Sequence, residues 1–433
     1  MPNIVIVGAS NAGHLLAAAL GPKLPSTHRI VIIDPAPTSY WPIASLRAAV
    51  VPGWESKVYH KLEQKNFFAS GSKNVLVRQK VLKLEPSSVV LDGEFEGSNV
   101  VPFDVGRETF LLNVSRLLIL IPSFRSLQAL VIATGASQPF PMRPKREWSA
   151  EQVEQRFKEM QREIAGSQNI VVLGGGPTGI EFTGVSDDCF LTGCVGKAEA
   201  DKIVAFRLVQ EVLGKFTGSE SKKITLIHRK PQLIDTRAYK KLAVTLEQKL
   251  RAAGVDLILG DEHVAGPDFK TEKQAPGAVV RTKQGKEISA DYVFLAVGNS
   301  PNSQLVADVD PSAIGPSRLI NVNDKLQIVS KFFPSNNVFA AGDCCDAPGW
   351  RSLISSEAEA NTVAVNVLAS IGKGAMKKHK AGMRAMIVPL GENNGVSLII
   401  LRSKLYLHFI DPFLSFHAGR IRPDALVGRL DVA

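Results

Sequence analysis

The stretch NIVIVGASNAG, residues 3–13, decides the fold class of this chain. Residues 4–7 are apolar and β-branched, which is typical of a buried parallel strand. Gly8 permits a tight turn, and Gly13 lets the following Ala/Leu-rich helix, to about Leu20, pack closely against the strand. The next strand, residues 29–33, ends on Asp34, where an acid binds ribose hydroxyls. We therefore predict a dinucleotide-binding unit whose pyrophosphate lies on the free N–H groups of the helix start. Its predicted contacts are Gly8, Ala9, Ser10, Asn11, Ala12, Gly13 and Asp34.

The same plan recurs in NIVVLGGGPTG, residues 169–179, and it predicts pyrophosphate contacts at Gly174, Gly176 and Gly179. The second strand of this unit ends on His228 and Arg229 rather than on an acid. Arginine can hold a 2′-phosphate that aspartate would repel, so the pattern favours NADPH over NADH. The alternative is that both residues are solvated strand ends, and NADH then stays open.

Two dinucleotide units in one chain indicate two dinucleotides, FAD in the first and NADPH or NADH in the second. The expected fold class is α/β, with two Rossmann-like domains and a small C-terminal α+β part. ALVIATG (129–135), FLAVG (294–298) and VFAAGD (338–343) support it, since each reads as a strand that ends in small residues. We expect an FAD-binding domain in residues 1–150 and 300–372, an NAD(P)-binding domain in 151–299, and a C-terminal part in 373–433.

Composition limits the partners of the chain. The formal net charge of +10 favours anionic partners: dinucleotides, an acidic membrane surface or nucleic acid. The four cysteines include no C-x-x-C pair and no metal-ligand pattern, so we expect no dithiol relay and no metal. The start MPNIVIVGAS shows no signal peptide, and Pro2 excludes N-myristoylation. No window has the roughly 20 uncharged residues of a membrane span. We expect a cytoplasmic protein, with contact to a membrane surface and the oligomeric state left open.

At this point the chain resembles the apoptosis-inducing-factor-like flavoproteins, and within them the ferroptosis-suppressor branch. The matching stretches cover most of the chain, at residues 4–13, 46–50, 131–137, 171–181, 224–229, 337–344 and 391–396. The resemblance implies a disulfide-reductase-like flavoprotein fold. It also implies a FAD-dependent NAD(P)H oxidoreductase whose acceptor is a quinone or a similar small molecule.

The resemblance also assigns residues. Arg47 lies in the segment that follows the flavin, and Asp343, next to Gly342, is implied to bind the ribityl chain. The crossovers between the domains end at Ala133, Thr134, Gly135 and at Gly298. Glu181 matches an acid near the nicotinamide and the flavin, and it is the candidate catalytic residue. From the residues alone, Glu181 could equally be a first-turn acid that interacts with the helix dipole.

Extra chain interrupts this plan in two places. Gly179 and His228 are 49 residues apart, whereas Gly13 and Asp34 are 21 apart. Removing Val185–Gln210, 26 residues, restores the interval, and removing Val105–Gln128, 24 residues, joins a strand directly to ALVIATG. Family likeness also stops near residue 396. The dipeptide Val-Ser begins two of these three blocks, and Gln is the last residue of both internal blocks. Translated introns would have these residues at their edges. The alternative is a set of genuine surface insertions, because added loop length costs little.

Two other functions therefore compete with the oxidoreductase. The basic charge allows a nucleic-acid-binding effector of the apoptosis type, although no nucleic-acid motif is present. The interrupted units allow an inactive product of a mis-spliced gene model.

Overall fold

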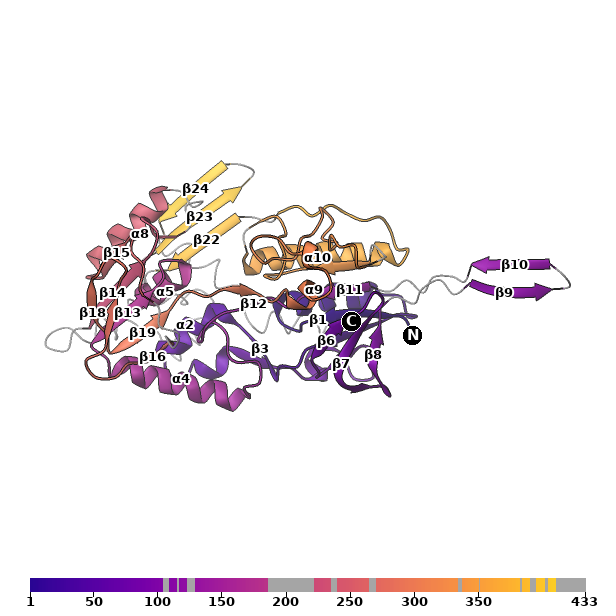
Figure 1. Cartoon of the computed structure of the whole chain (residues 1–433), viewed down its shortest axis with the longest axis horizontal. Helices are drawn as coiled ribbons and strands as arrows, with labels where there is room; N and C mark the ends of the chain where they lie inside the picture. The colour runs from indigo at the N-terminus through magenta and orange to yellow at the C-terminus, as the bar shows by residue number, and fades with distance from the viewer. Residues whose placement is uncertain are drawn as a thin grey trace, which may run out of the picture.

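The computed structural model describes residues 1–103, 109–114, 117–122, 129–185, 222–234, 240–264, 270–333, 337–349, 351–381, 384–389, 395–401 and 404–409. Two lobes make up the body of the molecule, each built around a parallel sheet (Figure 1). The predicted α/β class is confirmed.

The first lobe contains a five-stranded sheet in the order β21-β11-β1-β2-β5, in which all neighbours are parallel. The sheet alternates its side chains between two faces. Ile4 and Ile6 pack with the helices, and Val5 and Val7 pack on the opposite face, under the antiparallel sheet β6-β7-β8. The strands and helices of this lobe are β1 (Asn3–Val7), β2 (Arg29–Ile33), β5 (Val75–Val77), β11 (Ala129–Ile132), β21 (Val338–Ala340), β6 (Val81–Leu84), β7 (Ser88–Phe95), β8 (Ser98–Pro102), α1 (Asn11–Leu20) and α10 (Leu353–Ser370).

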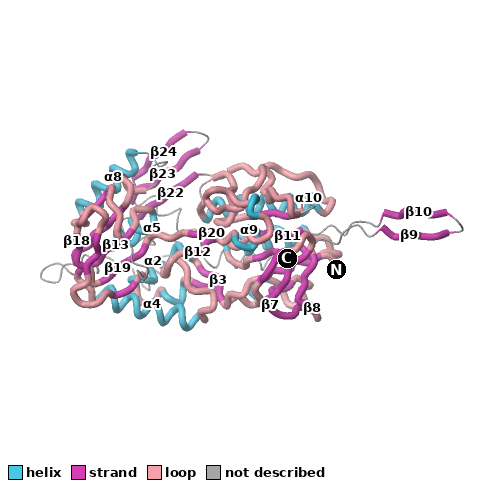
Figure 2. The backbone as a smooth tube through the Cα atoms, viewed as in Figure 1, coloured by secondary structure: helices cyan, strands magenta, loops and turns pink. Residues whose placement is uncertain are grey.

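The second lobe repeats the arrangement with the strand order β15-β14-β13-β19-β16. The first four strands are parallel, and β16 is antiparallel to β19. Figure 2 shows the helices of this lobe flanking the sheet. Its elements are α4 (Ala150–Ala165), β13 (Asn169–Leu173), α5 (Pro177–Val185), β14 (Lys223–His228), α8 (Lys240–Ala252), β15 (Asp256–Leu259), β16 (Glu272–Lys273), β17 (Val279–Arg281), β18 (Glu287–Ser289) and β19 (Tyr292–Leu295).

The remaining elements connect or cover the two lobes. Helix α2 lies in sequence between β2 and β5 of the first sheet but packs against α4 and α5, within the hydrophobic core of the second lobe. The C-terminal strands form an antiparallel sheet, β22-β23-β24, that contacts α5 and α8. These elements are β3 (Thr38–Tyr40), α2 (Pro42–Val50), β4 (Tyr59–Lys61), α3 (Gln64–Phe67), β12 (Ala136–Ser137), β20 (Ser300–Pro301), α9 (Gln304–Ala307), β22 (Arg384–Pro389), β23 (Gly395–Leu401), β24 (Lys404–Phe409) and the 3-10 turns Gly21–Lys23, Glu55–Lys57 and Pro311–Ala313.

The first suspected insertion contains a separate hairpin. Strands β9 (Thr109–Val114) and β10 (Leu117–Pro122) pair with each other, and with no other strand that the structure describes. The hairpin projects from the body in Figure 1. On either side of it, Phe103 and Ala129 are both fully buried in the first lobe. The fold is therefore packed up to both ends of this segment.

The other two suspected boundaries differ from the first. Helix α5 is described as far as Val185, and most of Val185–Gln210 lies outside the described residues. The backbone passes through residue 396 inside β23, so no strand is interrupted where family likeness stops. The splice interpretation stays a prediction.

Every helix in the described ranges is too short or too polar to cross a membrane.

Candidate functional site

The predicted flavin contacts lie on one edge of the first sheet. In the order β21-β11-β1-β2, the carboxyl ends of four neighbouring strands bring together Gly342, Ala133, Gly8 and Asp34. Ligands of open parallel sheets bind at this edge. Ser10 stands at the N-cap of α1, and Asn11, Ala12 and Gly13 form its first turn. One edge therefore collects these predicted contacts, although their roles stay predictions.

Close backbone packing explains the glycines of the first loop. Gly8 has φ of +110°, and a Cβ atom there would lie 2.3 Å from the carbonyl oxygen of Ala133. A Cβ atom on Gly13 would lie 1.9 Å from the carbonyl oxygen of Gly8. The Asp34 carboxylate accepts the N–H of Ala9 at 2.8 Å and that of Ala36 at 2.9 Å. Asp34 thus holds the loop, and a carboxylate retains further lone pairs that can accept from a ribose hydroxyl.

The second loop has the same geometry with different chemistry. Gly174 has φ of +119°, and a Cβ atom on Gly179 would lie 1.9 Å from the carbonyl oxygen of Gly174. Where Asp34 accepts the N–H of Ala9, His228 Nδ1 accepts the N–H of Gly175 at 3.0 Å. Both acceptors stand at the end of the second strand of their unit. A histidine thus replaces the acid and holds the loop in the same way.

The protonation state of His228 follows from this contact. Nδ1 accepts a hydrogen bond, so the proton of the neutral ring is on Nε2. Burial lowers the pKa of His228, and the charges of Lys230 and Arg229 lower it further. His228 Nε2 is buried, and a backbone interaction with Gln232 opposes part of the fall in pKa. The ring is therefore a neutral group beside the second glycine loop, with its Nε2 proton inside the protein.

Gly176 differs from the other loop glycines because no atom lies within 4 Å of the position that its Cβ would occupy. It directly precedes Pro177, the first residue of α5. The first backbone N–H groups of a helix have no partner inside the helix. An anion fits at such a helix start. This open backbone is the observation that matches the predicted nicotinamide pyrophosphate.

The two connections between the lobes are joined to each other. After β11, Thr134 Oγ1 donates to the carbonyl oxygen of Asn302 at 2.6 Å, and Asn302 Nδ2 donates to the carbonyl oxygen of Thr134 at 2.9 Å. Ser137 donates to Asn302 Oδ1 at 2.6 Å, and strand β12 pairs with β20. Gly135 and Gly298 have φ of +66° and +90° in these connections. Sequence reasoning missed Asn302, which no motif distinguishes.

Three further predicted residues lie outside the two glycine loops. Arg47 lies in α2, with its guanidinium 4.4 Å from the centroid of the Trp54 ring. Arg229 follows β14 and is exposed. The backbone of Glu181 lies in α5, but its side chain is outside the described residues, so its catalytic role stays a prediction.

The turn that bears Asp343 has two further neighbours that sequence reasoning missed. Glu359, on α10, accepts the N–H of Gly342 at 2.7 Å. Arg143 is largely buried, and burial lowers its pKa while the charge of Asp343 opposes the shift. No motif in the sequence marks Glu359 or Arg143, and Glu359 stands near a second acid, Glu357, in the same helix.

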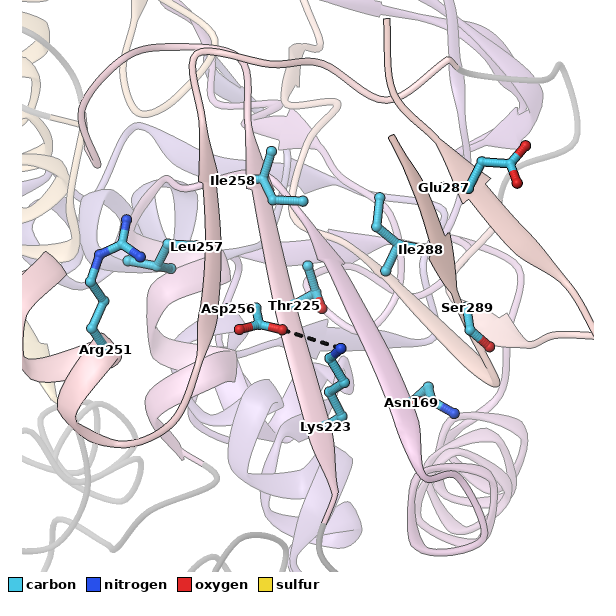
Figure 3. Close-up of a pocket in the computed structure, with 10 residues that line it drawn as sticks. All are labelled: Asn169, Lys223, Thr225, Arg251, Asp256, Leu257, Ile258, Glu287, Ile288 and Ser289. Atoms are coloured by element: carbon cyan, nitrogen blue, oxygen red, sulfur yellow. Dashed lines mark ion pairs between the residues drawn. The ribbon is translucent and has the colours of Figure 1, made fainter. Parts of the chain in front are cut away.

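A cavity of about 310 Å³ opens elsewhere on the second lobe (Figure 3). It lies at the amino ends of the strands, where Asn169, Lys223 and Asp256 begin β13, β14 and β15. Lys223 and Asp256 form an exposed ion pair there at 3.4 Å. Since nucleotides bind at the opposite edge of such sheets, this cavity is separate from the candidate site.

Comparison with known proteins decides the family. The sequence pattern of the pyridine nucleotide-disulphide oxidoreductases matches residues 2–366. The chain belongs to the pyridine nucleotide-disulphide oxidoreductase family. The family is one of flavin-dependent pyridine-nucleotide oxidoreductases, and it implies FAD and a nicotinamide nucleotide as cofactors. The assignment of the two glycine loops to these cofactors stays a prediction.

Individual members of the family are similar over most of the chain. Ferroptosis suppressor protein 1 of Homo sapiens is 23% identical over 398 residues, covering 92% of this chain and 88% of that protein. Apoptosis-inducing factor homolog B of Dictyostelium discoideum is 22% identical over 415 residues, covering 92% and 89%. The predicted resemblance is therefore confirmed at the level of the family and its apoptosis-inducing-factor-like members.

Solved structures of other proteins share the fold. The sulfide:quinone oxidoreductase of Aquifex aeolicus superposes with a TM-score of 0.66 at 15% identity, covering 100% of this chain and 93% of that one. A ferredoxin reductase of Rhodopseudomonas palustris gives a TM-score of 0.57 at 16% identity, covering 93% and 83%.

Proposed function

We propose that this chain is a FAD-dependent NAD(P)H oxidoreductase that passes electrons to a quinone-like acceptor. The observation that carries the proposal is a hydrogen bond that recurs in both glycine loops. In each loop, the side chain at the end of the second strand accepts the backbone N–H of the residue after the first glycine. Asp34 accepts from Ala9, and His228 accepts from Gly175. The fold shared with a sulfide:quinone oxidoreductase supports the quinone-like acceptor, which the resemblance stated from the sequence also implies.

The residues present fit both cofactors. The start of α1 and the Gly342 turn would hold FAD, and the start of α5 with Gly176 would hold the pyrophosphate of the nicotinamide nucleotide. When bound, FAD supplies the redox chemistry, because it accepts a hydride and passes electrons on. The contribution of this chain is to position the two nucleotides, since hydride transfer depends on orientation more than on acid–base groups.

We further propose that NADPH is the preferred donor. A neutral His228 carries no negative charge at the position where the first unit has the Asp34 carboxylate, and Arg229 and Lys230 add positive charge directly after it. A 2′-phosphate accepts hydrogen bonds and is attracted by these charges, whereas a carboxylate would repel it.

Anaerobic titration of the purified, flavin-containing protein tests the proposal. We expect NADPH, and NADH more weakly, to bleach the flavin absorbance, and a quinone such as menadione to restore it. A preparation without flavin absorbance, or a flavin that neither nucleotide reduces, would contradict the oxidoreductase function. A reduced flavin that quinones leave unchanged would contradict only the acceptor class.

His228→Asp tests the choice of nucleotide. The new carboxylate can still accept the N–H of Gly175, as Asp34 does in the first loop, but it repels a 2′-phosphate. We expect the KM for NADPH to rise by about tenfold or more while the KM for NADH changes less. Lys223→Ala, at the exposed amino end of the same strand, is the matched control and should leave both values unchanged. An equal change for both nucleotides in His228→Asp would contradict the role of His228.

A further inference from the structure

Glu359 is a buried carboxyl group that the proposed chemistry does not use. It lies on α10, and only 5% of the residue is exposed to solvent. Its Oε2 atom accepts the backbone N–H of Gly342 at 2.7 Å. A carboxyl group is costly to bury, so its presence at this position needs a reason beyond packing.

The contact places Glu359 directly behind the predicted flavin site. Gly342 has φ of +83°, and a Cβ atom there would lie 3.1 Å from Cβ of Ala12, in the first turn of α1. Helices α1 and α10 also pack against each other. Glu359 therefore fixes the turn that carries Asp343 against the helix start where the FAD diphosphate would bind.

The surroundings of Glu359 favour its neutral form. Burial raises the pKa of Glu359 to about 7, the N–H of Gly342 opposes this shift, and the charge of Asp343 adds to it. The other titratable group on this turn is the Cys345 thiol, whose pKa the charge of Glu359 helps to raise. His14 is the titratable residue of α1, and its ring packs on Phe67 with 4.8 Å between the ring centroids.

A bound flavin would shift this balance further. The diphosphate adds negative charge near a turn that already bears Asp343, and the bound cofactor excludes water. Both effects penalise the ionised form of a neighbouring carboxyl group. A group that is partly ionised in the free protein would then become protonated in the complex.

We propose that Glu359 is a positioning residue of the flavin site that takes up one proton from solvent when FAD binds. This inference rests on the proposed function, because it requires FAD at the start of α1. By proton linkage, FAD affinity should be constant at low pH and should fall as the pH rises above 7.

Calorimetric titration of FAD into the flavin-free full-length protein tests the inference. At each pH between 6 and 8.5, buffers of different ionisation enthalpy report the number of protons taken up. For the wild type we expect uptake that approaches one proton near pH 8, and an affinity that falls by up to about tenfold per pH unit above 7. Glu359→Gln keeps an oxygen acceptor for Gly342 without a titratable group, so it should bind FAD with no uptake and no pH dependence in this range.

Glu357→Gln is the matched control, because Glu357 is exposed on the same helix, and it should behave as the wild type. A merely structural role would change affinity in Glu359→Gln by the same factor at every pH and would contradict the proposal. A wild type that binds FAD without proton uptake would also contradict the proposal, and this measurement does not depend on whether the variant folds. Absence of any FAD binding would instead overturn the proposed function together with the inference.

Discussion

The second glycine loop contains two kinds of glycine. Gly13 and Gly179 are required by the fold, because a side chain at either position would overlap the backbone of the preceding turn. Gly176 is surrounded by open space, so the fold itself would accept a methyl group there. The motif treats these positions alike, and only the packed structure separates them.

Gly176→Ala and Gly179→Ala test this distinction as a pair. We expect Gly176→Ala to fold with unchanged stability and to raise the KM for the nicotinamide nucleotide by at least about tenfold, since the methyl group fills the pyrophosphate position. Gly179→Ala should lower the free energy of unfolding by about 3 kcal/mol. Thermal unfolding and anaerobic flavin reduction measure the two effects, and a destabilised Gly176→Ala would contradict the assignment.

At the level of elements, helix α4 shows how far sequence reasoning reaches. Residues 151–164 carry many charged side chains, as is typical of an exposed helix, and the structure has a helix at Ala150–Ala165 with a capping box between Ser149 and Gln152. Its C-terminal end is held by Lys222, whose Nζ donates to the carbonyl oxygens of Ile164, Ala165 and Ser167. That partner is remote in sequence, so no local pattern could reveal it.

Lys222→Met should destabilise the second lobe, because it leaves buried carbonyl groups without their donor. We expect the free energy of unfolding to fall by about 2–4 kcal/mol, measured by urea unfolding. Lys223→Met is the control, because Lys223 is adjacent and its side chain is 65% exposed. Equal losses in the two variants would contradict the capping role of Lys222.

The β9–β10 hairpin is expected to be dispensable for the flavin site. Deleting Val105–Gln128 removes two strands that pair only with each other among the described strands, so we expect flavin content to persist and Tm to change by less than about 4 °C. Deleting residues 88–103 should abolish folding, because that hairpin buries Val89, Val101 and Phe103. Loss of flavin in the first deletion would show that the segment is an integral part of the lobe.

At the scale of the whole molecule, contacts at the two connections and at α2 join the lobes. Asn302 joins the two connections through Thr134 and Ser137, and α2 packs across into the core of the second lobe. Productive hydride transfer needs the two nucleotides at a fixed separation, and small displacements are costly. The bonds of Asn302 therefore belong to function as much as to stability.

Asn302→Ala should slow the reduction of the flavin by roughly tenfold or more, while the affinity for the nicotinamide nucleotide stays within about twofold. Stopped-flow reduction and equilibrium binding measure the two quantities. Ser137→Ala, which removes only the bond from Ser137 to Asn302, is the milder control. A variant that reduces its flavin at the wild-type rate would show that the lobes are oriented by other contacts.

The sequence by itself determined the two strand–glycine loop–helix units and their order in the chain. These features depend on local patterns, namely buried β-branched strands, glycine turns and, in the first unit, the acid after the second strand. Such patterns involve only residues that are close together in the chain. The tertiary structure alone decided that His228 takes the place of Asp34, that Asn302 joins the connections and that Glu359 supports the Gly342 turn. Each of these contacts joins positions far apart in the chain, and its strength comes from burial, which a single stretch of sequence does not specify.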